Sequence, residues 1–413
     1  MVLSTVQKRT FLATGLVLIF LFLTRRDLPH VPERLSTQLT LGQGIQSHHG
    51  MLKEVRQWQR KEQIRKIVGL VFYGRRDQAS ILDCYLKRNL AKNGGVLDEV
   101  VWLQRTENKD DLAFLEKLVS SDSHYMRVDV DRTEGGYASA YDGIEDDVLY
   151  VKIDTDIVYI EDTTILSMVH TRATRPDYYL IGANVINQPL SSWLHWSLGA
   201  VRPYLPENTT SHAGHGERQK LTPVDWRASS LPEWSAAQDF DIGQWSPPED
   251  RKHRWLPVRK RTPGHTLDGT PILSTTYNAY ESPGWWNWVV GAQQHYSFFE
   301  NLETDQLRRY RFDLWDYRDY RMGLQLVTMT GRDINSAKPI AEDDEGYFCV
   351  EVPKRTGRYA AAAGGGVASH YSFGAQKGGM DKTDILDRYR SYAQDNICRE
   401  KMLWTSEEDD AAA

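Results

Sequence analysis

Two aspartates, Asp154 and Asp156, interrupt the apolar run "LYVKIDTDIVYI" (residues 149–160), which otherwise suits a buried strand. Side chains alternate in an extended segment, so both carboxylates are expected on one side while Thr155 points away. An ionised carboxylate in an apolar setting is costly unless it is paired, hydrogen-bonded or bound to a metal. At the end of a strand, such a pair is suited to hold a hard divalent cation beside a diphosphate. A surface acidic turn is the alternative explanation.

A second group of carboxylates lies in "PIAEDDEGYF", residues 339–348. Its members stand together between apolar residues: Glu342, Asp343, Asp344 and Glu345. Like charges that are crowded together raise one another's pKa, which suits a group that must accept a proton. Asp344 is the first candidate for a general base and Asp343 is the second. A solvated acidic loop is the alternative.

The elements that must position these groups alternate between strand and helix. Strands are predicted at 66–74, 97–104, 124–130, 147–153 and 177–186, and helices near 82–90, 112–119 and 161–173. This alternation predicts a mainly parallel sheet with helices on both faces. Ligands of such folds bind at the carboxyl ends of the strands, which is where the run through Ile153 delivers the aspartates.

The overall composition is that of a globular protein. The 413 residues include 50 basic and 56 acidic side chains, a formal net charge of −6, so no general attraction to nucleic acid is expected. The three cysteines lack the CxxC spacing of a zinc site. Cys84 fits the buried side of a helix, which leaves Cys349 and Cys398 as a candidate disulfide in an oxidising compartment.

The N-terminal region indicates where the protein resides. The run "FLATGLVLIFLFL" (residues 11–23) is apolar and flanked by basic residues, but it is shorter than the roughly 20 residues of a typical span. A short membrane anchor is favoured over a cleaved signal peptide because no small-x-small site follows. A glycosylation sequon at Asn208 weakly suggests that the body faces a lumen.

These features divide the chain into successive segments. They are a tail (1–10), a membrane anchor (11–24), a stalk (25–65), a donor-binding half with the aspartate pair (66–205), a Pro/Trp-rich insertion (206–271), a second half with a C-terminal helix (272–404) and a tail (405–413). The insertion is interpreted as an ordered segment that tryptophans pin to the body, or else as an acceptor-binding surface. The small-residue run "YAAAAGGGVA" (359–368) is interpreted as a mobile loop.

An anchor, a stalk, an α/β half and the motif "VKIDTDIVYI" together resemble a metal-dependent glycosyltransferase of the GT-A fold. The likeness is to Golgi type II membrane enzymes with a lumenal catalytic domain, nearest to uncharacterised fungal glycosyltransferase-like proteins. It covers roughly 66–203 and 285–376. The motif departs from the family pattern, since DTD stands where DDD is more often expected.

The resemblance implies a nucleotide-sugar donor (UDP- or GDP-sugar), a hydroxyl acceptor on a glycan, protein or lipid, and Mn²⁺ or Mg²⁺. Asp156 would ligate the metal directly, and Asp154 would lie nearer the ribose or a metal-bound water. His370, in "ASHYSFGAQ", matches the late histidine that often completes the metal site. A structural histidine is the alternative.

The same resemblance sketches the rest of the site. Inverting members suggest that an acidic-cluster carboxylate takes the acceptor proton, although retaining enzymes carry the same DxD motif. The expected donor-pocket residues are Tyr73 on the base, Arg75 or Arg76 on phosphate, and Tyr137 or Tyr141 facing the nucleotide. Trp285, Trp286 and Trp288 are expected on the acceptor side, and His295 is expected to be structural.

Two other classes of function remain open. One is a noncatalytic carbohydrate-binding or scaffold protein that retains the fold, which has no need of the aspartates, His370 and the acidic cluster together. The other is a nucleotidyltransferase, which would show a glycine-rich phosphate loop after its first strand; "YGRRDQAS" is not one.

Overall fold

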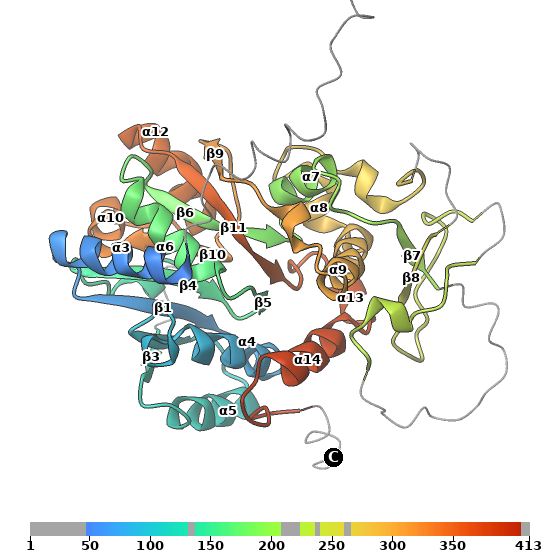
Figure 1. The fold of residues 1–413 in the computed structure, drawn as a ribbon, viewed down its shortest axis with the longest axis horizontal. Coiled ribbons are helices and arrows are strands. Elements are labelled where there is room, and N and C mark those ends of the chain that lie inside the picture. The colour runs from blue at the N-terminus through green and yellow to red at the C-terminus, as the bar shows by residue number, and fades with distance from the viewer. Residues whose placement is uncertain (1–46, 131–136, 208–223, 236–239, 260–265, 406–413) are drawn as a thin grey trace, which may run out of the picture. The chain divides into compact units, whose positions relative to one another are not determined.

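The computed structural model describes residues 47–130, 137–207, 224–235, 240–259 and 266–405 (Figure 1). The predicted anchor at 11–24 and the sequon at Asn208 lie outside these ranges. Within them, no helix is both long and apolar enough to cross a membrane.

The predicted stalk ends earlier than expected. Helix α3 (His48–Lys61) lies within it and packs against α6 (Thr164–Thr174). Val55 of α3 is completely buried in the main core. Helix α3 therefore belongs to the folded body, rather than serving as a spacer.

Nine strands in the described part of the chain form one sheet. They are β1 (Lys66–Tyr73), β2 (Glu99–Gln104), β3 (Tyr125–Asp129), β4 (Val148–Asp154), β5 (Ile157–Ile160), β6 (Leu180–Ile186), β9 (Leu314–Arg318), β10 (Leu326–Thr330) and β11 (Ala360–His370). Their order is β3-β2-β1-β4-β10-β6-β11-β5, with β9 also paired to β11. Strands β5, β9 and β10 run against the other six, so the prediction of a mainly parallel sheet is confirmed.

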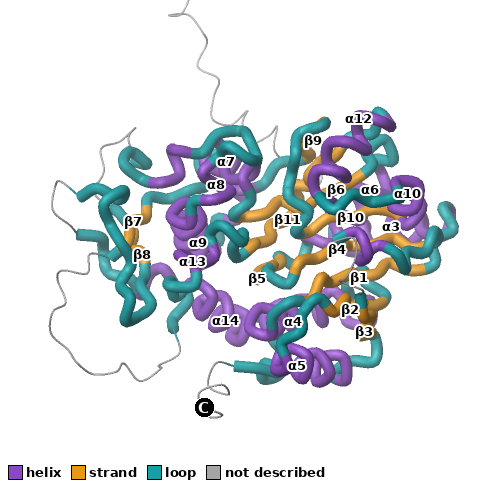
Figure 2. The backbone as a smooth tube through the Cα atoms, turned by 180° about the vertical axis from the view of Figure 1, so that it is seen from behind, coloured by secondary structure: helices purple, strands orange, loops and turns teal. Residues whose placement is uncertain are grey.

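Helices flank the sheet (Figures 1 and 2). Besides α3 and α6 they are α4 (Arg76–Asn89), α5 (Lys109–Ser120), α7 (Pro189–Ser197), α8 (Pro283–Trp286), α9 (Trp288–Glu303), α10 (Gly331–Ala337), α11 (Asp344–Gly346), α12 (Val352–Thr356), α13 (Lys377–Met380) and α14 (Ile385–Asn396). Two hydrophobic clusters cover opposite faces, because neighbouring strand residues alternate: Val71 and Tyr73 enter the larger cluster and Phe72 the smaller. The larger contains residues of α4, α6 and α9, and the smaller contains Ile334 of α10.

The small-residue run is a strand rather than a mobile loop. Almost all of β11 is buried, between β6 on one side and β5 and β9 on the other. Glycine is required because a Cβ atom on Gly365 would collide with Ser167 of α6, and one on Gly366 would collide with Thr164. The absence of side chains therefore permits close packing of β11 on α6.

The proline-rich insertion (206–271) contributes β8 (Trp255–Pro257) to a separate two-stranded sheet, whose other strand, β7 (Tyr204–Pro206), lies at the start of the insertion. Trp226 packs edge-on against Tyr392, with ring centroids 4.8 Å apart. The indole of Trp234 donates a hydrogen bond to the Pro206 carbonyl (3.0 Å). Trp226 and Trp255 belong to the larger hydrophobic cluster, so tryptophans attach the described parts of the insertion to the body.

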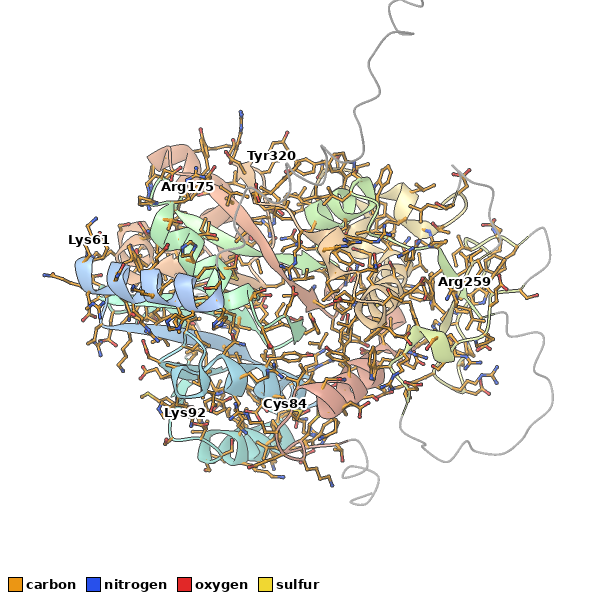
Figure 3. The ribbon with its side chains drawn as sticks, in the orientation of Figure 1. Lys61, Cys84, Lys92, Arg175, Arg259 and Tyr320 are labelled. Atoms are coloured by element: carbon orange, nitrogen blue, oxygen red, sulfur yellow. A yellow bond between two sulfur atoms is a disulfide. The ribbon has the colours of Figure 1, made fainter. Side chains whose placement is uncertain are left out.

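The cysteine pairing differs from the prediction. Cys84 of α4 forms a disulfide with Cys398, and Cys349 is a buried free thiol. Cys84 is on the buried side of its helix, as expected, but α14 packs on α4 and brings the following residues to it (Figure 3). Cys349 instead lies in the smaller cluster, where its thiol contacts the Met322 carbonyl (3.2 Å).

Candidate functional site

A cleft of about 630 Å³ opens where β1 and β4 end. Its lining includes Phe72, Gly74, Arg75, Gln78, Arg105, Tyr137, Lys152, Asp154, Thr155, Asp156, Arg321, Leu324, Glu342, Asp343, Asp344, Glu345, Ser372, Gly374 and Lys377. The aspartate pair and the acidic cluster, nearly 190 residues apart in the chain, therefore face one cavity. It lies at the carboxyl ends of parallel strands, the position expected from the fold.

The first aspartate is paired with a lysine of its own strand. Lys152 and Asp154 share a face of β4, and the Lys152 Nζ atom lies 2.6 Å from Asp154 Oδ1 and 2.9 Å from the Leu324 carbonyl. Burial raises the pKa of Asp154 to about 6, against the opposing effect of the Lys152 charge. Burial lowers the pKa of Lys152, but the charges of Asp154 and Asp344 outweigh it and the net shift is upward.

The second aspartate faces a histidine. His370, at the end of β11, places Nε2 3.2 Å from Asp156 Oδ2 and Nδ1 3.2 Å from the Asn187 carbonyl. Burial opposes the charge on both groups, but their mutual attraction is stronger: the pKa of Asp156 is lowered and that of His370 is raised. Asp156 Oδ1 is buried and has no hydrogen-bond partner among the described residues.

Threonine between the two aspartates has a structural role. Its hydroxyl donates to the Phe72 carbonyl and accepts from the Gly74 amide (3.1 Å). Thr155 thus ties the end of β4 to the end of β1, the two strands that border the cleft. A third carboxylate at this position would lose the donated hydrogen bond, which accounts for DTD in place of DDD.

The predicted metal ligands are only partly brought together. Asp156 and His370 meet, but Asp154 is paired with Lys152. The described ranges contain no group of three or more His, Cys, Asp and Glu side chains placed to hold a metal ion. By donor chemistry, a carboxylate oxygen such as that of Asp156 and an imidazole such as that of His370 are ligand types that suit Mn²⁺.

The acidic cluster divides into groups with different partners. Asp344 Oδ2 accepts a hydrogen bond from the Tyr141 hydroxyl (2.8 Å), and the residue is 8% exposed. Arg321 donates to both oxygens of Asp343 (2.6 and 2.8 Å) and to Glu345 (2.7 Å).

Burial and Arg321, more than crowding of like charges, control the pKa values of Asp343 and Glu345. The hydrogen bond from Arg321 lowers the pKa of Asp343. Burial raises the pKa of Glu345, against Arg321, and the charge of Asp344 adds only a smaller effect. A carboxylate with a lowered pKa is a weak base, which argues against Asp343 as a proton acceptor.

Two of the expected donor-pocket residues lie elsewhere. Tyr73 is fully buried on the opposite face of the sheet, where its hydroxyl donates to the Asp111 carbonyl (2.6 Å). Arg76 pairs with Asp111 (3.0 Å) and lies over the Trp404 ring, outside the cleft lining. The prediction was wrong by one strand position, because Phe72 rather than Tyr73 faces the cleft.

Two other expected residues, Arg75 and Tyr137, reach the cavity. Arg75 lines it directly before α4, and Tyr137 lines it with 51% of its surface exposed. The Arg105 guanidinium lies 4.3 Å above the Tyr137 ring. Tyr141, the alternative to Tyr137, is buried and contacts Asp344 instead.

Sequence reasoning missed several cleft residues, namely Phe72, Arg105, Lys152 and Arg321. A signal existed for Lys152, because a lysine two positions before Asp154 in an apolar strand must face the same side. Arg321 had none, since it belongs to an irregular segment between β9 and β10.

The three acceptor-side tryptophans are not equivalent. Trp285 lines a small hollow beside the cleft, and Trp286 is exposed. Trp288 packs among Trp245, His253 and Trp255. His295 is fully buried and bonded to the Tyr389 hydroxyl (2.8 Å) and the Tyr371 carbonyl (3.0 Å), so its predicted structural role is confirmed.

Comparisons with known proteins give little further guidance. No protein-family model matches the sequence, and no curated protein matches it. Among solved structures, the chain is similar to 4-diphosphocytidyl-2C-methyl-D-erythritol synthase from Anaerococcus prevotii DSM 20548, at 12% identity and a TM-score of 0.23. The match covers 29% of this chain and 56% of that one. A likeness this slight carries no argument about fold or activity.

Proposed function

We propose that the protein is a metal-dependent glycosyltransferase that moves a sugar from a UDP- or GDP-sugar to a hydroxyl acceptor on a glycan, protein or lipid, with inversion. One observation carries the proposal: Asp154 ends the parallel strand β4, Asp156 follows it, and both line a cleft that Asp344 also lines. The cleft is large enough for a nucleotide-sized ligand.

The chain's own residues suit the steps of such a transfer. Phe72 and Tyr137 offer rings near the first strand for a nucleotide base, and Arg75, Arg105 and Lys377 line the cleft as cations for a diphosphate. Asp344 is the proposed base that takes the proton of the attacking hydroxyl. Arg321 fixes the segment that carries Asp344, through its bonds to Asp343 and Glu345.

Asp156 and His370 are the residues that would hold a Mn²⁺ or Mg²⁺ ion, with other ligands from the donor and water. Such an ion would neutralise charge on the leaving diphosphate. Asp154 would contribute indirectly, by holding Lys152, whose ammonium supplies one positive charge at the end of β4.

The proposal includes a location in the Golgi membrane, as a single-pass type II protein with the body in the lumen. The disulfide between Cys84 and Cys398 supports an oxidising compartment. The anchor itself rests on the sequence of residues 11–24.

A noncatalytic carbohydrate-binding or scaffold function is the second candidate. It is favoured by one observation, that Asp154 is already neutralised by Lys152. The unpartnered oxygen of Asp156 argues against it, because a scaffold gains nothing from a buried carboxylate oxygen without a partner.

The test is a donor screen with the full chain. The protein, with Mn²⁺ or Mg²⁺, is incubated with a panel of UDP- and GDP-sugars and released nucleotide is measured, alongside Asp156→Ala and the exposed control Asp395→Ala. Metal-dependent release from one donor, lost in Asp156→Ala but kept in the control, is the expected result. Failure of every donor to be cleaved or to raise the melting temperature would favour the scaffold function.

A further inference from the structure

A small hollow adjoins the cleft and shares two of its residues, Arg321 and Glu345. The rest of its wall includes Gln188, which opens α7, and two aromatic side chains, Tyr280 and Trp285. The hollow therefore adjoins the cleft at the acidic cluster, to which Glu345 belongs.

Gln188 presents an unused hydrogen-bond donor at this wall. The residue is 1% exposed, and its side-chain oxygen accepts from the Ser191 hydroxyl (2.8 Å) and the Ser191 amide (3.3 Å). These bonds fix the orientation of the amide, because only the oxygen can accept from a backbone N–H. Its Nε2 atom has no partner among the described residues. A buried donor without a partner is unfavourable, and the hollow, at about 10 Å³, has room for a single oxygen atom as acceptor, from a water or from one hydroxyl of a ligand.

The aromatic pair offers the complementary apolar surface. Tyr280 is 53% exposed and Trp285 is 38% exposed, with ring centroids 6.4 Å apart at 71°. The Arg321 guanidinium lies 4.6 Å from the Tyr280 ring centroid and holds that ring at the edge of the acidic cluster. Exposed rings beside buried polar groups form a surface that is partly apolar and partly hydrogen-bonding.

We propose that Gln188, Tyr280 and Trp285 form a saccharide-binding subsite for the acceptor. A sugar has an apolar C–H face, which stacks on aromatic rings. It also has hydroxyl oxygens, one of which can accept a hydrogen bond from the N–H group of Gln188 that has no partner among the described residues. A lipid chain would bring hydrocarbon against Arg321 and Glu345, which is unfavourable for charged groups. The inference rests on the proposed function only in assigning the bound sugar as acceptor, and it narrows the acceptor from any hydroxyl to a glycan.

The experiment measures saccharide binding without any donor or metal. Tryptophan fluorescence and saturation-transfer NMR of the full chain are recorded with mannose-, galactose- and N-acetylglucosamine-terminated trisaccharides, a serine-rich peptide and detergent micelles. Variants are Trp285→Ala, Tyr280→Ala and Gln188→Met, with the exposed Tyr359→Ala as a control. Circular dichroism checks that each variant is folded. Gln188→Met removes the side-chain cap of α7 and can unfold the helix end, but Trp285→Ala and Tyr280→Ala change partly exposed residues and test the subsite independently.

One trisaccharide is expected to bind, with affinity reduced about tenfold or more in each aromatic variant and unchanged in the control. Equal binding by wild type and both aromatic variants would overturn the inference. So would binding of none of the trisaccharides, or binding of only the peptide or micelles. Saccharide binding that is lost in the variants, in a protein that cleaves no donor, would uphold the subsite while removing the transferase proposal.

Discussion

Lys152 and Asp154 stand on the same side of β4, two residues apart, with the ammonium 2.6 Å from the carboxylate. The lysine is almost entirely buried, so it serves the strand end rather than the surface. One of the two conspicuous aspartates is therefore neutralised by the chain itself. The other, Asp156, keeps an oxygen without a partner.

Replacement of Lys152 by methionine should destabilise the fold. Asp154 would keep a buried carboxylate without its ion-pair partner, and since its side chain is 30% exposed we expect a loss of about 1–3 kcal/mol in the free energy of unfolding. Urea denaturation measures this. The double variant Lys152→Met/Asp154→Asn should recover most of the loss; no recovery would show that Lys152 acts through packing instead.

Substitution by asparagine should have different effects at the neighbouring residues Asp343 and Asp344. Asp344→Asn removes the proposed base, and nucleotide release should fall by about 10²–10⁴-fold with the structure intact. Asp343→Asn breaks a partly exposed bond to Arg321, so it should lower the melting temperature and keep most of the activity. Kinetics and thermal unfolding of the two variants separate the roles, and a larger activity loss in Asp343→Asn would contradict the assignment.

Acid should destabilise the protein partly through His253. Burial lowers the pKa of His253 to about 4, from an ordinary value of 6.5, and both ring nitrogens lack partners among the described residues. Between pH 6.5 and pH 4, His253 binds a proton in the unfolded state but not in the folded state. Stability from this residue is therefore complete above pH 6.5 and falls by about 1.4 kcal/mol per pH unit down to pH 4.

The variant His253→Phe keeps an aromatic ring among the tryptophans. It should reduce the dependence of the free energy of unfolding on pH, between pH 4 and 6.5, by about 1.4 kcal/mol per pH unit. Denaturant unfolding at several pH values between 4 and 7 measures it. His124→Gln is the matched control at a more exposed histidine. Parallel curves for wild type and His253→Phe would show that His253 does not titrate as its burial requires.

Thiol counting tests the cysteine pairing. In denaturant without reductant, one thiol should react, that of Cys349, and after reduction three should react. The disulfide joins residues 314 positions apart, so Cys398→Ser should lower stability by about 2–4 kcal/mol. Peptide mapping without reduction identifies the disulfide-linked pair, and a Cys349–Cys398 peptide would contradict the structure.

The sequence predicted several parts of the fold and site for clear reasons. The alternating strands and helices from 66 to 186 carry strong local periodicity, and they appear as expected. β11 was missed because its small residues suit a loop locally, and only its position against Ser167 and Thr164 explains them. Tyr73 was misplaced because periodicity gives the alternation of a strand but not which side meets the cavity.

By itself, the sequence determined that a carboxylate pair ends a buried strand of an α/β sheet, because apolar runs and their interruptions are local properties. Tertiary structure alone decided which groups meet that pair. Lys152 and Asp344 line one cleft, and His370 contacts Asp156 at its wall, because β4 lies beside an antiparallel β10, while β11 returns next to β5. These pairings join segments about 170 to 210 residues apart, and their energies depend on burial and charge that exist only once the sheet has formed.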